Sequence, residues 1–156
     1  MNPSLRPTVI LMAEDDADDR LLARDAFARC RIANDLEFVE DGEELLDYLR
    51  GEGKFAAPGS APRPGIILLD LNMPRKDGRE ALREIKADPA LRGIPVVVLT
   101  TSKDEQDILR TYDLGANSFI MKPVTFQGLV DVMQGLERYW FHMVELPVGA
   151  GSRATH

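Results

Sequence analysis

The sequence has very few of the residues that mark disulfide-bonded, metal-thiolate or nucleic-acid-binding proteins. Cys30 is its only cysteine, so no disulfide can form within the chain. The two histidines, His142 and His156, are too few and too poorly placed for a histidine metal site or a catalytic triad. The formal net charge is -7, whereas nucleic-acid binding requires clustered Lys and Arg, so no nucleic-acid partner is expected.

Long apolar segments are also missing. No run of residues is long enough to span a membrane, and residues 1–7 lack the apolar centre of a signal peptide. We therefore expect a cytoplasmic protein with no membrane partner. The 156 residues suffice for one ordinary domain with a full core. We expect this single domain to cover residues 1–147, and residues 148–156 to form a disordered tail.

Short apolar runs, each followed by a helical pattern, recur along the chain. Strands are predicted at 9–13, 36–39, 66–69, 95–99 and 118–121, and helices at 19–31, 42–50, 79–87, 103–114 and 125–144. Residues 51–64 are rich in Gly, Pro and Ala and are predicted to form an exposed loop. This alternation predicts an α/β fold, with a five-stranded parallel sheet covered by helices on both faces. The flavodoxin-like strand order 2-1-3-4-5 is one of the few topologies that right-handed crossovers allow.

Polar side chains stand where the predicted strands end. Asp70 directly follows the apolar run 66–69, Glu14 and Asp15 follow the first strand, and Thr100 and Lys122 stand at the ends of the fourth and fifth. The carboxyl ends of parallel strands meet at one edge of a sheet, where ligands bind in open α/β folds. Taken alone, an aspartate in this place could equally well cap the turn that follows its strand.

Several carboxylates in one crevice repel one another, and their pKa values would rise without compensation. A hard divalent cation such as Mg²⁺ is the natural remedy, because it prefers octahedral oxygen ligands. Asp15 and Asp70 could bind it directly, Glu14 could bind through water, and a backbone carbonyl near Asn72 could complete the protein's share. Lys122 would bring a further positive charge.

This arrangement predicts phosphoryl transfer. Asp70 would attack phosphorus as a carboxylate nucleophile, while Lys122 offsets charge on the phosphoryl oxygens and Thr100 donates a hydrogen bond to one of them. No glycine-rich nucleotide loop is present, so the phosphate must arrive on another molecule. Bound FMN is disfavoured, because the acidic loop 14–16 would repel its phosphate. An Asp-nucleophile phosphatase is an alternative, although Asn72 stands where those enzymes usually place a second aspartate.

In their order and spacing, these motifs resemble the receiver domain of two-component response regulators. The matching residues are Glu14-Asp15, Asp70 followed by Met73-Pro74 and Gly78, Thr100, and Lys122-Pro123, and the match covers about residues 8–137. The resemblance implies that Asp70 accepts a phosphoryl group from a sensor histidine kinase, with Mg²⁺ bound by Glu14 and Asp15. It also implies a switch, in which Thr100 moves inward and Phe119 fills the vacated space; plain core packing of Phe119 is the alternative. Such a protein is a phosphoacceptor with only limited phosphorylation and dephosphorylation activity of its own.

The last predicted helix is apolar over about 200° of its circumference, which exceeds the ~100° needed for packing on one core. The excess predicts a homodimer interface. Its expected residues are Phe126, Leu129, Val132, Met133, Leu136, Tyr139, Trp140 and Met143. The alternatives are that loop 51–64 folds over this helix, or that the chain is a phosphate-independent adaptor acting only through it. The loop, the Leu-Thr-Thr-Ser sequence at 99–102 and the aromatic segment 137–147 resemble stand-alone receivers that serve phytochrome-type histidine kinases, which implies such a kinase as partner.

Overall fold

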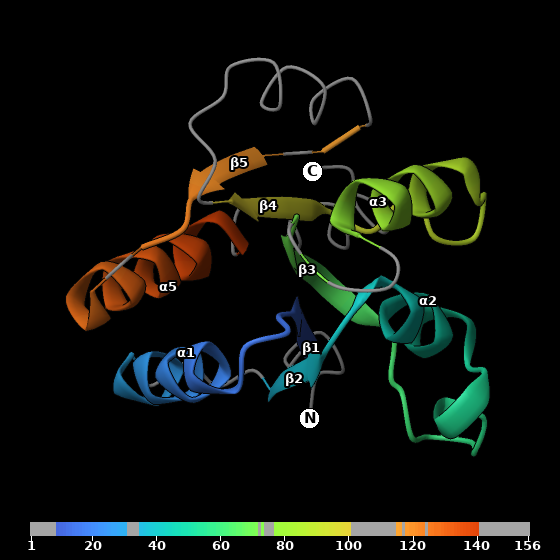
Figure 1. The fold of residues 1–156 in the computed structure, drawn as a ribbon, viewed down its shortest axis with the longest axis horizontal. Coiled ribbons are helices and arrows are strands. Elements are labelled where there is room, and N and C mark those ends of the chain that lie inside the picture. Colours follow the sequence, from blue (N-terminus) through green and yellow to red (C-terminus); the bar gives the residue numbers. More distant parts are fainter. Residues whose placement is uncertain are drawn as a thin grey trace, which may run out of the picture.

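The computed structural model describes residues 9–30, 35–71, 73, 77–100, 115–116, 118–123 and 125–140. Within these residues, five parallel strands form one sheet in the order β2-β1-β3-β4-β5 (Figure 1). The strands are β1 (Val9–Ala13), β2 (Asp35–Val39), β3 (Pro64–Asp70), β4 (Val96–Thr100) and β5 (Ser118–Met121). The predicted α/β fold and its strand order are therefore confirmed.

Helices cover both faces of the sheet. Helices α1 (Ala17–Arg29) and α5 (Phe126–Trp140) pack together on one face, and α2 (Gly42–Arg50) and α3 (Gly78–Ala87) pack together on the other (Figure 1). The predicted helix 103–114, residues 141–144 of the last predicted helix and the predicted tail 148–156 lie outside the described residues. None of the described helices is both long and apolar enough to cross a membrane.

An aspartate begins each of the helices α1, α2 and α3. The side chains of Asp16, Asp41 and Asp77 accept backbone N–H groups from the first turns of these helices, at 2.8, 2.8 and 3.0 Å. Such caps satisfy N–H groups that have no partner inside the helix. The Asp16 cap explains why α1 starts at Ala17, two residues before the predicted start.

The central strands are buried on both faces. All of β1 is buried, and residues 66–69 of β3 are fully shielded from solvent. The core beneath α1 and α5 includes Leu129, Met133 and Leu136, which are 8%, 1% and 5% exposed. These three residues were predicted at a dimer interface. Their side chains instead face the sheet and form part of the chain's own core, because this stripe of α5 is the one that covers the sheet.

Residues 51–63 pack against the α2 side of the molecule. The segment contains a short 3-10 helix, η2 (Gly53–Phe55), and the ring of Phe55 meets that of Tyr48 edge to face, with their centroids 5.0 Å apart. The Tyr48 hydroxyl donates a 2.9 Å hydrogen bond to the carbonyl of Pro62. Since α5 covers the opposite face of the sheet, the alternative in which this loop folds over the last helix is wrong.

Strand β2 forms one outer edge of the sheet. Asp35 and Glu37 are exposed, the alternate residues Leu36 and Phe38 are half-buried, and Val39 is buried. This period of two is expected for an edge strand that presents only one row of side chains to the core. Strand β5, at the other edge, has only four residues.

Candidate functional site

The carboxyl edge of the sheet brings together acidic side chains from two central strands. Asp70 is the last residue of β3, and Glu14 directly follows β1. The Glu14 backbone is fixed on both sides, because its N–H donates to the Val39 carbonyl and its own carbonyl accepts from Arg20 Nη1, each at 2.9 Å. The side chains of Glu14 and Asp70 are only 1% and 6% exposed. Two buried carboxylates this close need compensating positive charge.

Three carboxylates are close enough to share one cation. One oxygen from each of Glu14, Asp15 and Asp70 lies within 4.8 Å of the other two. Glu14 and Asp70 are buried and Asp15 is exposed, so the cluster is open to solvent on one side. A set of hard oxygen donors with one open side fits Mg²⁺ or Mn²⁺, which keep some of their water ligands. Asn72, predicted to add a backbone carbonyl, lies outside the described residues.

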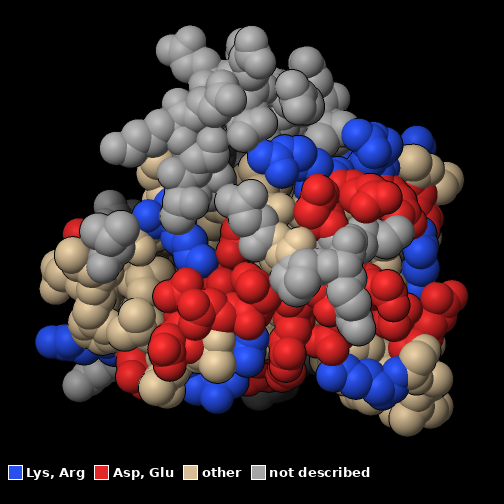
Figure 2. Space-filling model, in the orientation of Figure 1, with Lys and Arg blue, Asp and Glu red and all other residues tan. Residues whose placement is uncertain are grey.

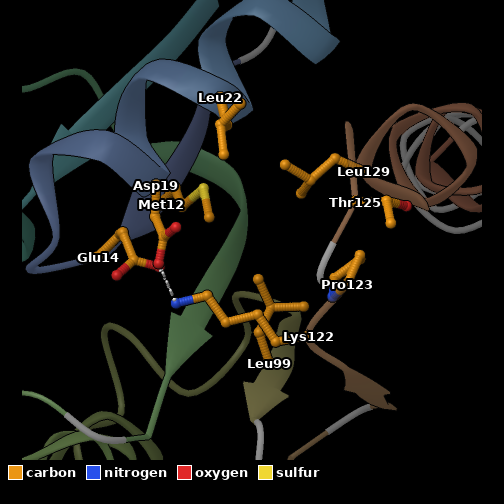
Figure 3. A pocket seen from close by; sticks show the side chains of 9 residues that line it. All are labelled: Met12, Glu14, Asp19, Leu22, Leu99, Lys122, Pro123, Thr125 and Leu129. Atoms are coloured by element: carbon orange, nitrogen blue, oxygen red, sulfur yellow. Dashed lines mark ion pairs between the residues drawn. The ribbon is translucent and has the colours of Figure 1, made fainter. Parts of the chain in front are cut away.

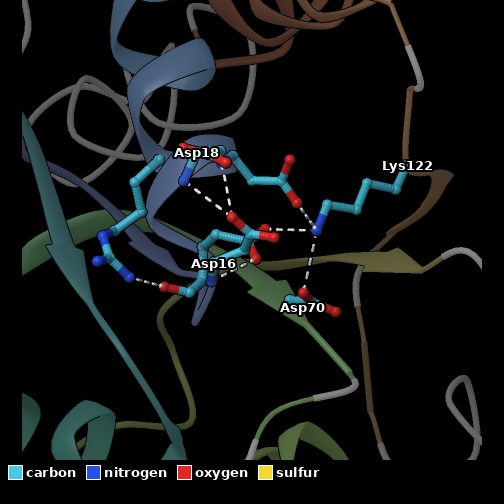
Figure 4. A network of polar contacts seen from close by, with 7 residues as sticks. Asp16, Asp18, Asp70 and Lys122 are labelled. Carbon is cyan, nitrogen blue, oxygen red and sulfur yellow. Dashed lines mark hydrogen bonds and ion pairs between the residues drawn. The ribbon is translucent and has the colours of Figure 1, made fainter.

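Lys122 supplies the positive charge in the described site. Its Nζ lies 2.6 Å from Glu14 Oε1, 2.9 Å from Asp19 Oδ2 and 3.2 Å from Asp70 Oδ2, and the dashed lines in Figure 4 converge on this ammonium. An ammonium has three N–H donors, so each can address one carboxylate. Burial alone would lower the pKa of Lys122, but the hydrogen bonds to Glu14 and Asp19 outweigh it and raise the pKa above its ordinary value.

Glu14 is the carboxylate most affected by its surroundings. Burial raises its pKa to about 7, Lys122 opposes this rise, and the negative charge of Asp70 adds to it. A carboxyl whose pKa lies near neutrality carries a proton part of the time. A divalent cation bound beside it would favour the ionised form, so metal binding and proton release are linked at this residue.

Asp19 was not predicted to belong to this site. In the sequence, Asp19 only marks the start of a helical pattern, because nothing in the local pattern links it to Lys122. The contact forms because Asp19 lies in the first turn of α1, which packs beside α5, and Lys122 lies between β5 and α5. A long-range ion pair of this kind leaves no periodic signal in the sequence.

The backbone of Asp70 is held tightly by the start of α3. The Gly78 N–H donates a 3.0 Å hydrogen bond to the carbonyl of Leu71. A Cβ atom at Gly78 would lie 2.5 Å from the Asp70 carbonyl oxygen and 2.7 Å from Leu71 Cα. Only glycine allows this approach, so the glycine found four residues after Pro74 in the sequence motif has a steric role beside Asp70.

A cavity of about 290 Å³ opens next to Lys122, between α1 and α5 (Figure 3). Its polar end is formed by Glu14, Asp19 and Lys122, and most of the remaining wall is apolar. The other lining residues are Met12, Leu22, Leu99, Pro123, Thr125 and Leu129. The cavity thus joins charged side chains to an apolar wall, a combination typical of binding sites.

The two predicted switch residues lie on neighbouring strands. Thr100 ends β4 and pairs in register with Met121, while Phe119 pairs with Val98. The backbone of Thr100 thus stands at the same sheet edge as Asp70. The side chains of Thr100 and Phe119 lie outside the described part of the chain, as do those of Tyr139 and Trp140 and the whole of Met143. Their roles stay predictions.

The described surface around the site is strongly acidic. Asp15, Asp16 and Asp18 are exposed after β1, and Glu40 is exposed after β2. In Figure 2, Asp and Glu side chains cover much of the described centre of the molecular face. Such a field attracts cations to this edge.

Comparisons with known proteins agree with this geometry. The model of the response regulator receiver domain matches residues 10–134. Response regulator Rcp1 of Synechocystis sp. is 41% identical over 141 residues, which cover 90% of this chain and 94% of Rcp1. The solved structure of the phosphorylated cyanobacterial phytochrome response regulator RcpA is 43% identical, covers 87% of this chain and 95% of its own, and superposes with a TM-score of 0.79. The Mn²⁺-bound form of Rcp1 has a TM-score of 0.78 at 40% identity, over 88% of this chain and 97% of its own. The chain therefore belongs to the response regulator receiver family and has that family's phosphoacceptor role.

Proposed function

We propose that Asp70 is the phosphoacceptor of this receiver domain and that it takes its phosphoryl group from a phosphohistidine of a sensor histidine kinase. The observation that carries this proposal is the meeting of Asp70, Lys122 and the Glu14–Asp15 pair at one sheet edge. Asp70 is a carboxylate with an ammonium 3.2 Å away and two further carboxylates within reach of a shared cation. This set combines a nucleophile with two sources of positive charge.

The chemistry needs one bond to form and one to break. An Asp70 carboxylate oxygen attacks phosphorus, the phosphorus–nitrogen bond of the phosphohistidine breaks, and the imidazole leaves with the bonding electron pair and takes up a proton. Lys122 contacts Asp70 Oδ2 and is placed to offset charge on the transferred phosphoryl oxygens. The domain has limited phosphorylation and dephosphorylation activity of its own.

Glu14, Asp15 and Asp70 would hold the divalent cation, for which we propose Mg²⁺. When bound, the cation supplies charge neutralisation for the phosphoryl oxygens. The related response regulator Rcp1 has an Mn²⁺-bound form, which supports binding of a divalent cation by this chain. Glu14 would bind the cation in its ionised form, and its contact with Lys122 would then weaken.

A phytochrome-type kinase is the partner that we propose, because RcpA is named as a phytochrome response regulator. Leu21 and Leu22 support a protein partner at this edge, since they are 58% and 40% exposed on α1, and Leu22 lines the cavity beside Lys122. Exposed apolar side chains that border an acidic site are typical of a docking surface. A cytoplasmic location is part of this proposal, because a kinase is charged by cytoplasmic ATP.

A homodimer through the last helix is also part of the proposal, with a smaller interface than the sequence predicted. With Leu129, Met133 and Leu136 assigned to the core, the candidate contacts are Phe126, Val132, Tyr139, Trp140 and Met143. The molar mass by light scattering tests this: Trp140→Ala should shift the protein from dimer toward monomer. A wild-type monomer at all accessible concentrations would contradict the dimer.

Phosphorylation by phosphoramidate, a small donor with the same phosphorus–nitrogen bond, tests Asp70 directly. Intact mass spectrometry should show one phosphoryl group on the wild type when Mg²⁺ is present, and none on Asp70→Asn. Asp77→Asn is the matched control, because asparagine also caps helices well and Asp77, at the start of α3, is not among the described carboxylates that pair with Lys122. Undiminished labelling of Asp70→Asn would contradict the proposal, as would a wild type that stays unlabelled.

The same experiment separates the two alternatives, which the family assignment does not favour. A phosphate-independent adaptor predicts no Mg²⁺-dependent labelling at all, and an Asp70→Asn protein that behaves like the wild type. An Asp-nucleophile phosphatase predicts steady turnover of small phosphate esters rather than a single labelled aspartate.

A further inference from the structure

Lys122 connects the carboxylate cluster to a residue outside it. Two of its three partners, Glu14 and Asp70, also belong to the group that could share a cation. The third partner, Asp19, lies 2.9 Å from Nζ but does not belong to that group. Lys122 and a bound cation would therefore compete for two carboxylates, whereas Asp19 pairs with Lys122 and lies outside the cation group formed by the described residues.

We infer that Asp19 is a positioning residue, which retains the Lys122 ammonium when a divalent cation binds the Glu14–Asp15–Asp70 cluster. This inference rests on the metal site of the proposed function. The cation draws Glu14 and Asp70 toward itself and repels the ammonium. Because Asp19 already contacts Nζ, the ammonium keeps one carboxylate partner and stays at the edge of the site.

The position of Asp19 suits this role. It is the third residue of α1, and its backbone N–H lies 3.3 Å from Asp16 Oδ1, the oxygen that caps the helix. Its side chain is 38% exposed, against 6% for Asp70, so the charge of Asp19 is hydrated when Lys122 turns elsewhere. Figure 3 shows Lys122 extending from the end of β5 toward Glu14 and Asp19 on the α1 side. Asp19 therefore contacts the Lys122 ammonium at the end of the side chain farthest from the Lys122 backbone.

Loss of Asp19 could act in two ways: it could free Lys122 and so favour the cation, or it could remove the partner that retains Lys122 and so disfavour it. We expect the second effect, a weaker binding of the cation. Without Asp19, the ammonium has only Glu14 and Asp70 as partners, so a cation must displace it from both with no replacement. The cost appears as a lower affinity for the cation. A purely structural role for Asp19, as a negative charge in the first turn of α1, predicts no such coupling to Lys122.

Asp18 provides a matched control. It carries the same charge, lies in the same first turn and is exposed, while Lys122 pairs with Asp19 and not with Asp18 among the described residues. Asp18→Asn and Asp19→Asn thus remove the same charge from the same end of α1. Only Asp19→Asn removes the contact with Lys122.

Titration of the metal-free protein with Mg²⁺ by calorimetry, and with Mn²⁺ by electron paramagnetic resonance, measures the effect without phosphorylation. We expect Asp19→Asn to weaken binding about fivefold, the upper end for a half-exposed ion pair, and Asp18→Asn by less than about twofold. In a Lys122→Met background the two substitutions should have equal effects, because the contact is already lost.

The outcomes separate this inference from the function on which it rests. Equal weakening by Asp18→Asn and Asp19→Asn in the otherwise wild-type chain would overturn the role of Asp19, with the metal site intact. A difference that persists in the Lys122→Met background would overturn it as well, because the effect would then not pass through Lys122. A wild type that binds neither Mg²⁺ nor Mn²⁺ would overturn the metal site itself, and the inference with it.

Discussion

Replacement of Gly78 by alanine should damage both the stability of the domain and the reactivity of Asp70. The added Cβ would lie 2.5 Å from the Asp70 carbonyl oxygen and 2.7 Å from Leu71 Cα, and real Cβ atoms essentially never approach closer than 3.0 Å. Both obstacles are backbone atoms, one of Asp70 and one of Leu71 directly after β3, so neither can rotate away. Helix α3 and the end of β3 must therefore move apart by at least about half an ångström.

The size of the effect follows from two opposing contributions. Overpacking of a well-filled interior costs about 1–3 kcal/mol, while alanine in place of glycine in a helix gains up to about 1 kcal/mol. We expect Gly78→Ala to lower the free energy of unfolding by about 1–2 kcal/mol, as measured by urea denaturation followed by circular dichroism. Because the strain acts at Asp70, phosphorylation by phosphoramidate should also slow by roughly tenfold, within the range that small misplacements of reacting groups produce.

Gly135 provides the control of opposite sign. It lies in α5, and a Cβ atom there would meet nothing within 4 Å. Gly135→Ala should therefore raise the free energy of unfolding by about 0.5–1 kcal/mol and leave phosphorylation unchanged. The reasoning is refuted if Gly78→Ala is as stable as the wild type and is phosphorylated at the same rate.

Three further substitutions test the charge, the loop and the core. Without metal, Lys122→Met should lower the free energy of unfolding by roughly 3 kcal/mol, because it leaves the buried carboxylates of Glu14 and Asp70 without a positive charge. Added Mg²⁺ should restore part of this loss. If Mg²⁺ has no effect on the stability of the variant, the proposed cation site is contradicted. Burial and the charge of Glu37 raise the pKa of Tyr48 to about 12, so the unfolded chain ionises near pH 10 before the folded one does. The wild type should thus lose up to roughly 2 kcal/mol of stability between pH 10 and 12 in urea titrations, and Tyr48→Phe should lose less over that interval; parallel losses would refute the assignment. Met133→Ala should lower the free energy of unfolding by about 2–5 kcal/mol, because the Met133 side chain is 1% exposed and packs in the core. A loss below about 1 kcal/mol would contradict the assignment of Met133 to the core.

The fold was predictable because its central strands are continuous apolar runs. Residues 9–13 and 66–69 are buried on both faces, and such runs, alternating with helical patterns, leave few topologies. The meeting of Glu14, Asp15 and Asp70 was also predictable, because parallel strands end at one edge. Helix starts were less predictable, since the Asp16 cap could not be told from the other aspartates that follow it.

The features that could not be predicted from the sequence depend on how helices and strands pack against one another. The contact between Asp19 and Lys122 exists only because α1 and α5 lie side by side on one face. Too many residues of the last helix were predicted at a dimer interface, because the apolar pattern does not show which stripe of the helix packs against the sheet. Leu129 and Met133 lie on that stripe and face the core. The loop 51–64 is mostly exposed, as predicted, but the packing of Phe55, its one aromatic residue, against Tyr48 was not predicted.

The outer strands of the sheet also affect how the protein behaves when it is concentrated. A strand at the margin of a sheet has unpaired peptide groups that can recruit the same strand from another molecule, which leads to open-ended ribbons. Here β2 turns Asp35 and Glu37 outward, and β5 is only four residues long. If two molecules paired through their β2 edge strands, the negative charges of Asp35 and Glu37 on one would lie close to those on the other. The architecture thus discourages polymerisation through the backbone and leaves side-chain surfaces on the helices as the means by which copies of this chain can meet.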